Sequence, residues 1–253
     1  MNLCDYNTIR DLLARHGFHF SKSMGQNFLI DPEVPRRIAE ASGADAGCGV
    51  LEIGPGIGPL TAELAQRAGK VVAVELDRAL LPVLAETMAP YPNVEVVPGD
   101  VLKLDLTAIA AEKFQGLTPI VCANLPYNVT SPILEKLVES PCFTAFTVMI
   151  QREVARRLCA PQGSSEGGSF SLFLQYYMKP ELLFDVPPEK FLPAPKVTSA
   201  VIRCVRRERP AVDVADEGFF FKVMRGGFLL RRKTLANSLS AALPGIPKES
   251  IQQ

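Results

Sequence analysis

The feature that most constrains this chain is a series of short apolar runs separated by segments of helical spacing. The runs lie at 49–54, 70–75, 94–97, 119–123 and 145–150. The helical segments lie at 7–16, 32–41 (after a helix start at Asp31-Pro32), 59–68, 79–89, 131–138 and 152–158. Strands that alternate with helices predict a parallel sheet with right-handed crossovers.

Four chemistry-bearing residues stand at or just past the ends of these runs, namely Gly54, Glu75, Asp100 and Asn124. In open α/β sheets, ligands bind beyond the carboxyl ends of the strands. The sequence therefore predicts a binding site along this edge of the sheet.

The C-terminal part of the chain has a different pattern. Two extended segments are expected at 172–177 and 196–205, joined by a proline-rich stretch at 187–195. From about residue 212 the pattern turns helical, with helices expected at 217–228 and 232–242 and another beginning at Pro247. We therefore expect a catalytic domain over 1–208 and a small helical domain over 209–253.

Composition excludes several classes of protein. No apolar run approaches the roughly 18 residues that a membrane helix needs, and the N-terminus lacks the pattern of a secretory signal. The six cysteines form no CxxC pair and have no zinc-ligand spacing. We expect a cytoplasmic protein with reduced thiols, no metal and no membrane association.

Charge is balanced overall but unevenly distributed. The 27 basic and 27 acidic residues give a net charge of zero, yet 218–248 holds six basic residues and no acid. The stretch 201–209 adds four arginines against one glutamate. This asymmetry suggests a polyanionic partner, although a solvated helix face would give the same pattern.

The first strand leads into a glycine-rich turn with Gly54, Gly56 and Gly58. Glycines let the backbone approach a ligand closely at a strand-to-helix turn. A dinucleotide fingerprint needs glycine at position 59, where this chain has proline, so NAD binding is disfavoured. The pattern resembles motif I of class I S-adenosylmethionine-dependent methyltransferases, although an ordinary structural turn is the alternative.

Two carboxylates follow the next strands. Glu75 can accept both hydroxyls of a ribose, with Asp77 as its competitor. Asp100 can accept a hydrogen bond from an adenine amino group. Either carboxylate alone could be an ordinary surface acid. Both, however, follow strands of the same predicted sheet as the glycine-rich turn.

The fourth strand ends in Asn124-Leu125-Pro126-Tyr127. The N6 lone pair of adenine is delocalised into the ring, so a methylating site must accept both N–H groups. The Asn124 amide oxygen and a backbone carbonyl beside Pro126 can do so, and Tyr127 offers a face for stacking. Such catalysis rests on positioning and electrostatics, with the base extruded or single-stranded.

Together these residues resemble the N6-adenine methyltransferases. Further motifs at 9–13, 17–18, 21–31, 151–154, 191–201 and 231–239 are similar to those of the small-subunit rRNA adenine dimethyltransferases. The resemblance implies a class I S-adenosylmethionine-dependent methyltransferase fold. It is Rossmann-like, with a mostly parallel sheet, helices on both faces and a small C-terminal all-helical domain. The implied reaction dimethylates N6 of two adjacent adenines in the 3′-terminal hairpin loop of small-subunit rRNA, with a role in subunit biogenesis.

The resemblance also implies residue roles. The S-adenosylmethionine site would comprise Gln26, Asn27, Leu29, Gly54, Gly56, Gly58, Glu75, Leu76, Asp100, Val101 and Asn124. The reacting region would comprise Asn124, Leu125, Pro126, Tyr127 and Phe191, with the target adenine between the two aromatic rings. RNA phosphates would meet Arg10, Lys22, Arg152, Lys222, Arg225, Arg231, Arg232 and Lys233. The expected partner is an immature small ribosomal subunit, bound by a monomer.

The chain departs from this family in two places. The segment 160–169 has Ser165 and Gly167 where relatives usually show a lysine and a tyrosine, which affects an RNA-facing loop. Relatives usually carry more helix after Ile251, so we expect a shorter or incomplete small domain. Two alternatives stay open: a large-subunit rRNA methyltransferase of the macrolide-resistance type, and a non-catalytic assembly factor.

Overall fold

The computed structural model describes residues 1–18, 26–230 and 232–252. The chain forms two compact units, one of Met1–Ala155 with Glu181–Arg206 and one of Arg156–Pro180 with Arg207–Gln253. The second unit thus includes the segment C-terminal to 208 and also residues 156–180. The catalytic and RNA-binding roles expected for the two parts stay predictions.

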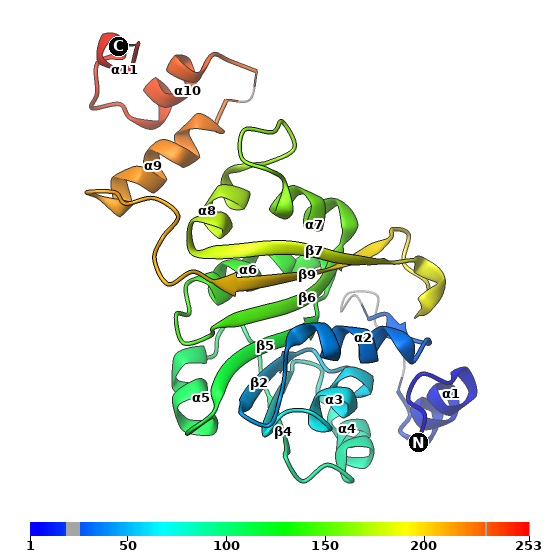
Figure 1. Ribbon diagram of the computed structural model, residues 1–253. Helices are drawn as coiled ribbons and strands as arrows, with labels where there is room; N and C mark the ends of the chain where they lie inside the picture. The colour runs from blue at the N-terminus through cyan, green and yellow to red at the C-terminus, as the bar shows by residue number, and fades with distance from the viewer. Residues whose placement is uncertain (19–25, 231, 253) are drawn as a thin grey trace. The chain divides into compact units, whose positions relative to one another are not determined.

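The first unit is built on a seven-stranded sheet in the order β4-β3-β2-β5-β6-β9-β7 (Figure 1). Five strands are parallel: β2 (Cys48–Ile53), β3 (Lys70–Glu75), β4 (Val94–Pro98), β5 (Thr118–Asn124) and β6 (Ala145–Gln151). Strand β9 (Ser199–Arg206) runs antiparallel to β6, and β7 (Met178–Val186) lies at the edge. The predicted α/β fold with a mostly parallel sheet is confirmed.

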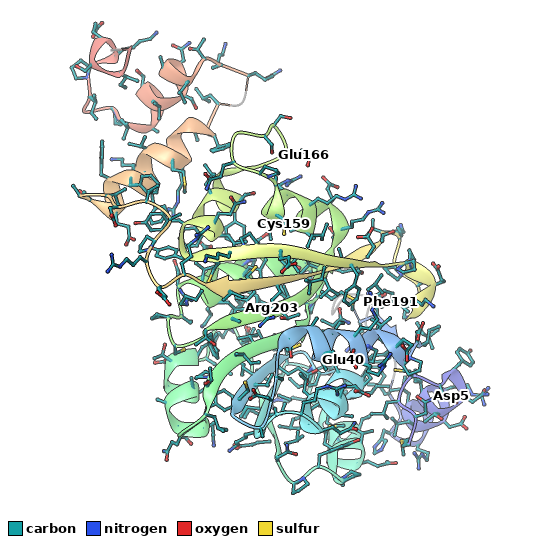
Figure 2. The ribbon with its side chains drawn as sticks, in the orientation of Figure 1. Asp5, Glu40, Cys159, Glu166, Phe191 and Arg203 are labelled. Carbon is teal, nitrogen blue, oxygen red and sulfur yellow. The ribbon has the colours of Figure 1, made fainter. Side chains whose placement is uncertain are left out.

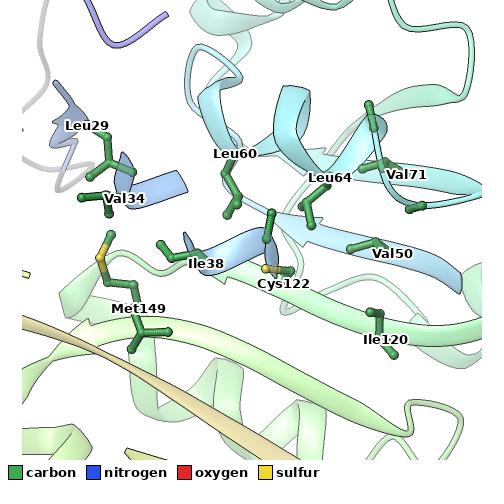
Figure 3. Packing of buried hydrophobic residues seen from close by; sticks show 14 of the residues in the cluster. Leu29, Val34, Ile38, Val50, Leu60, Leu64, Val71, Ile120, Cys122 and Met149 are labelled. Carbon is green, nitrogen blue, oxygen red and sulfur yellow. The ribbon is translucent and has the colours of Figure 1, made fainter. Parts of the chain in front are cut away.

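Helices α2 (Glu33–Ser42) and α3 (Pro59–Ala65) cover one face of this sheet. Ile38 and Leu64 pack with Val50 and Cys122 in a buried cluster (Figure 3). Asp31 does help to start α2, because its Oδ1 accepts the Glu33 N–H at 2.9 Å. The remaining helices of this unit are α1 (Tyr6–Arg15), α4 (Leu81–Met88), α5 (Leu106–Lys113) and α6 (Thr130–Val138). Helix α7 (Arg152–Cys159) begins in this unit, and its residues from Arg156 onward belong to the second.

A second, two-stranded sheet joins segments that are far apart in the sequence. Strand β1 (Phe28–Leu29) pairs antiparallel with β8 (Phe191–Leu192), which arises from the proline-rich stretch. The Ile30 N–H donates to the Lys190 carbonyl at 2.9 Å, and Lys190 Nζ lies 2.6 Å from Asp31 Oδ2. The N-terminal motif and the proline-rich motif are therefore held side by side.

The second unit contains α8 (Ser169–Tyr177), α9 (Glu217–Gly227), α10 (Leu235–Ala242) and α11 (Lys248–Gln252). Aromatic rings join α8 to α9, with the Tyr176 and Phe220 ring centroids 5.3 Å apart. Helix α10 packs closely on α9, because the Ser238 hydroxyl donates to the Gly226 carbonyl at 2.6 Å. Helices lie at the three places expected in this region, although α10 begins at Leu235 rather than at 232.

The extended segment expected at 172–177 is wrong, because these residues belong to helix α8. Their aromatic and apolar composition favours a strand, but tertiary contacts decide otherwise. The Gln175 amide donates to the carbonyls of Leu158 and Ala160, and the Ser171 hydroxyl donates to that of Arg157. The strand that the sequence did not predict is β7. Its Pro180 argues against a strand in the sequence, but this proline is tolerated because β7 lies at the edge of the sheet.

One arginine of the basic stretch 201–209 has a structural role. The Arg206 guanidinium donates to four carbonyls, those of Phe143, Leu137, Val138 and Ser140, at 2.9–3.2 Å. These bonds tie the end of α6 and the loop that follows it to the end of β9. The positive charge at this position is therefore explained without a polyanion.

We predict that Arg206→Met lowers the free energy of unfolding by roughly 2–4 kcal/mol, because several carbonyls lose their donor. Chemical denaturation measures this change. Arg10→Met, at a largely exposed arginine on α1, is the matched control and should change stability little. Equal effects of the two substitutions would contradict the structural role of Arg206.

Candidate active site

A cavity of about 300 Å³ opens at the carboxyl ends of the parallel strands, a size typical of small-molecule sites. It lies within the first unit. The expected cofactor and catalytic residues that line it are Gln26, Asn27, Leu29, Gly54, Gly56, Glu75, Leu76, Asp100, Val101, Asn124, Leu125, Pro126, Tyr127 and Phe191. Residues from the N-terminal segment, four strand ends and the proline-rich stretch therefore meet at one site.

The glycine turn after β2 leaves one side of the cavity open. Gly54 has φ +67°, and a Cβ built there would meet no atom within 4 Å. Gly58 has φ +95° and does not line the cavity; a Cβ there would lie 2.5 Å from the Met88 side chain. Gly54 thus leaves room for a ligand, whereas Gly58 allows close packing on α4.

Glu75 is oriented by its own backbone surroundings. Its Oε1 accepts the Asp77 N–H at 2.7 Å, and its Oε2 accepts the Gly56 N–H at 3.3 Å. Burial raises the pKa of Glu75, whereas these hydrogen bonds lower it. Asp77 instead accepts hydrogen bonds from the Ala79 N–H and the Gln26 amide, and it does not line the cavity.

Asp100 follows β4 and lines the cavity together with the apolar residues Leu76 and Val101. Its Oδ1 accepts the Leu102 N–H at 3.0 Å, which fixes the carboxylate on the turn. Leu76 is 55% exposed although it lines the cavity, and Val101 is buried. This corner offers apolar faces with one hydrogen-bond acceptor.

The loop after β5 is fixed at three points. The Leu125 N–H donates to the Met149 carbonyl at 3.1 Å. The Pro126 carbonyl accepts the Thr130 hydroxyl at 3.1 Å. The Tyr127 hydroxyl lies 2.6 Å from the Ser199 hydroxyl. Asn124, the last residue of β5, begins this fixed loop and faces the cavity.

Phe191, labelled in Figure 2, lies on β8 and is the register partner of Leu29 on β1; it also lines the cavity. Its side chain is buried. An aromatic ring thus joins Tyr127 in the lining, although the two residues are 64 positions apart in the sequence.

Glu52 is a cavity residue that the sequence reasoning missed. It lies within β2, is 1% exposed, and its Oε2 has no hydrogen-bond partner among the described residues. The pKa of Glu52 is raised to about 8, chiefly by burial; the Thr61 side chain acts to lower it and the Glu75 charge acts to raise it. A charged residue inside an otherwise apolar strand was the signal that could have revealed it.

Among the residues expected to contact RNA, those that the structure describes lie outside the cavity lining. Arg10 pairs with Asp11 at 3.1 Å and Arg152 with Asp185 at 3.4 Å. In the second unit, Lys222, Arg225, Arg232 and Lys233 are exposed. Lys22 and Arg231 lie outside the described residues. Phosphate contact by this set stays a prediction.

The part of the chain that the structure describes spans residues 1–18, 26–230 and 232–252. In that part of the chain, no group of three His, Cys, Asp or Glu side chains could hold a metal ion. None of the helices described there has the length and apolar character needed to span a bilayer.

Comparison with known sequences identifies relatives of this chain. The family model described as "Ribosomal RNA adenine dimethylase" matches residues 17–252. Proteins from Bacillus mycoides (strain KBAB4) and Bacillus cereus (strain AH187), each named "Ribosomal RNA small subunit methyltransferase A", are 50% identical to it over 245 residues. The similarity covers 96% of this chain and 84% of each relative.

Solved structures show the same fold. A dimethyladenosine transferase from Plasmodium falciparum superimposes with a TM-score of 0.73 and 28% identity, covering 86% of this chain and 77% of that one. The 23S rRNA methyltransferase ErmE superimposes with a TM-score of 0.71 and 29% identity, covering 89% of this chain and 87% of that one.

The raised pKa of Glu52 predicts a pH-dependent stability. Between about pH 4.5 and 8 the unfolded chain releases this proton while the folded chain keeps it, so stability falls as the pH rises. Glu52→Gln removes this loss. The variant should gain up to about 1 kcal/mol per pH unit over the wild type across this window, with little difference below it.

Thermal or urea unfolding from pH 4 to 8.5 measures the effect. Glu139→Gln, at an exposed glutamate, is the control and should follow the wild type. A constant difference between Glu52→Gln and the wild type at all pH values would show that the Glu52 carboxyl ionises normally.

Proposed function

Because the chain belongs to the ribosomal RNA adenine dimethylase family, we propose that it dimethylates N6 of two adjacent adenines in the 3′-terminal hairpin loop of small-subunit rRNA. The chain is an rRNA adenine dimethyltransferase. The proposal names its methyl donor as S-adenosylmethionine. The observation that carries it is the fixed Asn124–Tyr127 loop, which shares one cavity with Gly54, Glu75 and Asp100.

The cavity fits the methyl donor. Gly54 leaves an open side for the methionine part, and Glu75 faces the cavity with a carboxylate suited to ribose hydroxyls. Asp100 offers an acceptor for the adenine amino group between Leu76 and Val101. The unpartnered Oε2 of Glu52 suits the positive end of such a ligand. When bound, the donor supplies an electrophilic methyl group on a sulfonium sulfur.

The loop after β5 positions the target amine. The Pro126 carbonyl already accepts the Val129 N–H and the Thr130 hydroxyl, which turns it toward α6. We therefore assign the two acceptors of the amine to the Asn124 amide oxygen and the Leu125 carbonyl. These bonds draw the N6 lone pair out of the ring system, and it would then form the new bond to the methyl carbon while the carbon–sulfur bond breaks and the sulfur leaves as a neutral thioether. The displaced N–H proton passes to water, so the site needs no strong base.

Tyr127 and Phe191 hold the base itself. Both rings line the cavity, and stacking of a base on an aromatic ring contributes roughly 1–3 kcal/mol. The target adenine must leave its own stack to reach them. An unpaired hairpin loop lowers the cost of that step.

Small-subunit rRNA is favoured over large-subunit rRNA as the substrate. The relatives named for the small subunit are 50% identical over 96% of this chain, whereas ErmE is 29% identical. The similarity to ErmE keeps the large-subunit reaction as the second candidate. A complete set of cavity residues argues against a non-catalytic factor.

The wider setting is also part of the proposal. The enzyme acts in the cytoplasm, as a monomer, on an immature small subunit. Arg10, Lys22, Arg152, Lys222, Arg225, Arg231, Arg232 and Lys233 contact phosphates and position the RNA. Structured rRNA is recognised largely by shape.

The substrate is tested by transfer of labelled methyl from S-adenosylmethionine to small subunits that lack the modification. We expect N6,N6-dimethyladenosine at two adjacent loop adenines, detected by nuclease digestion and nucleoside analysis. Unmodified large-subunit rRNA is the parallel substrate. Transfer to that RNA alone would move the assignment to the second candidate, and transfer to neither would leave a binding factor.

The role of Asn124 is tested separately by Asn124→Ala. Cofactor affinity should stay within a few-fold, while methyl transfer falls by roughly 100-fold or more, because a contact specific to the transition state is lost. Calorimetric titration and single-turnover transfer measure the two quantities. Asn7→Ala, exposed on α1, is the control. Undiminished turnover of Asn124→Ala would contradict the role of Asn124 as an acceptor for the target amine.

A further inference from the structure

Ser199 is a buried polar residue that the reaction described above does not use. It is the first residue of β9, is 0% exposed, and pairs in register with Gln151 at the end of β6. The Arg152 N–H donates to the neighbouring Thr198 carbonyl at 3.0 Å, which fixes the start of this strand. The Ser199 hydroxyl therefore has a well-defined position.

This hydroxyl lies 2.6 Å from the hydroxyl of Tyr127, 72 positions away in the sequence. The pair joins β9 to the loop after β5, beyond the paired strands themselves. Burial raises the pKa of Tyr127, so its hydroxyl stays neutral at physiological pH and remains able to donate. The hydrogen bond is thus maintained under the conditions in which the enzyme works.

The opposite end of the Tyr127 side chain is fixed as well. Tyr127 begins a 3₁₀ turn (Tyr127–Val129), in which the Val129 N–H donates to the Pro126 carbonyl at 3.3 Å. The ring is therefore held at its backbone and at its hydroxyl, while it lines the cavity between these ends. The hydroxyl of a partly buried tyrosine normally has a hydrogen-bond partner, and Ser199 is that partner here.

We propose that Ser199 is a positioning residue for the target adenine, because its hydroxyl fixes the plane in which the Tyr127 ring stacks on the base. The inference rests on the proposed function and deepens it. Ser199 contacts neither substrate nor cofactor; it acts through Tyr127. A supporting residue of this kind keeps a site within the geometry that productive transfer needs.

Two transfers to the same nitrogen make this positioning measurable. The base must have the same orientation in both transfers. If the Tyr127 ring is held less firmly, the monomethylated base is released more often before the second transfer. The ratio of N6-methyladenosine to N6,N6-dimethyladenosine therefore reports the hold on the base. A general loss of stability would lower the amount of active enzyme without changing this ratio.

The test is Ser199→Ala, assayed on unmodified small subunits with S-adenosylmethionine. We expect kcat to fall roughly three- to tenfold, the loss that one neutral hydrogen bond carries, and the monomethylated fraction to rise. KM for S-adenosylmethionine should stay within twofold of the wild type. Tyr127→Phe removes the same hydrogen bond but keeps the ring, so it should give the same defect, and the double variant should be no worse than either single one.

Thr147→Val is the matched control. Thr147 lies on the neighbouring strand β6, and its buried hydroxyl has no hydrogen-bond partner in the described part of the chain. Its kcat and product ratio should equal those of the wild type. Melting temperatures check that each variant folds, and Tyr127→Phe decides the question if Ser199→Ala does not fold.

The outcomes separate the two proposals. A wild-type product ratio and kcat in Ser199→Ala and Tyr127→Phe, or additive losses in the double variant, would overturn the positioning role alone. A wild-type protein that transfers no methyl to small subunits would overturn the proposed function, and the positioning role would fall with it.

Discussion

The active site depends on the parallel pairing of β2 with both of its neighbours, β3 and β5. Leu51 is the register partner of Val72 on one side and of Val121 on the other. Adjacent strands lie about 4.8 Å apart, so the ends of β4, β3, β2 and β5 span roughly 14 Å of one sheet edge. Their terminal residues follow in the order Asp100, Glu75, Gly54 and Asn124. Asp100, Glu75 and Gly54 follow the order of adenine, ribose and methionine in the proposed methyl donor, and Asn124 ends the next strand, β5. The chain reverses its strand order between β2 and β5, where such ligands bind.

The sheet edge alone does not complete the cavity. Leu29 and Phe191 come from the separate β1–β8 ladder, which the ion pair between Asp31 and Lys190 supports. The Lys190 ammonium also lowers the pKa of Asp31, as expected for a carboxylate with a close cationic partner. Because β8 lies in the proline-rich stretch, the residue that we propose to cover the target base is fixed by contacts with the N-terminal segment. The residues that we propose for the cofactor and for the target base therefore share one small structural support.

The sequence predicted the features that local chemistry determines. Apolar runs ending at Gly54 and Glu75 were enough to place both residues at the cavity, because a parallel sheet brings its carboxyl ends together. The sequence failed where distant contacts decide the outcome. Residues 172–177 have strand-like composition, yet the buried hydrogen bonds of Gln175 hold them in a helix. The bond between Tyr127 and Ser199 joins positions 72 residues apart, and no local pattern announces such a pair.

Glu52 shows how a functional site departs from the rules that stabilise the rest of the fold. An apolar side chain at this position of β2 would suit its buried surroundings better than a carboxyl whose Oε2 lacks a partner. The free protein therefore holds this group protonated at neutral pH, as its raised pKa indicates. A cationic group brought into the cavity favours the ionised form of the same carboxyl. Strand β2 thus keeps a residue that weakens the fold at the place where a positively charged ligand would be stabilised. Such a conflict between local stability and function is expected of an active site.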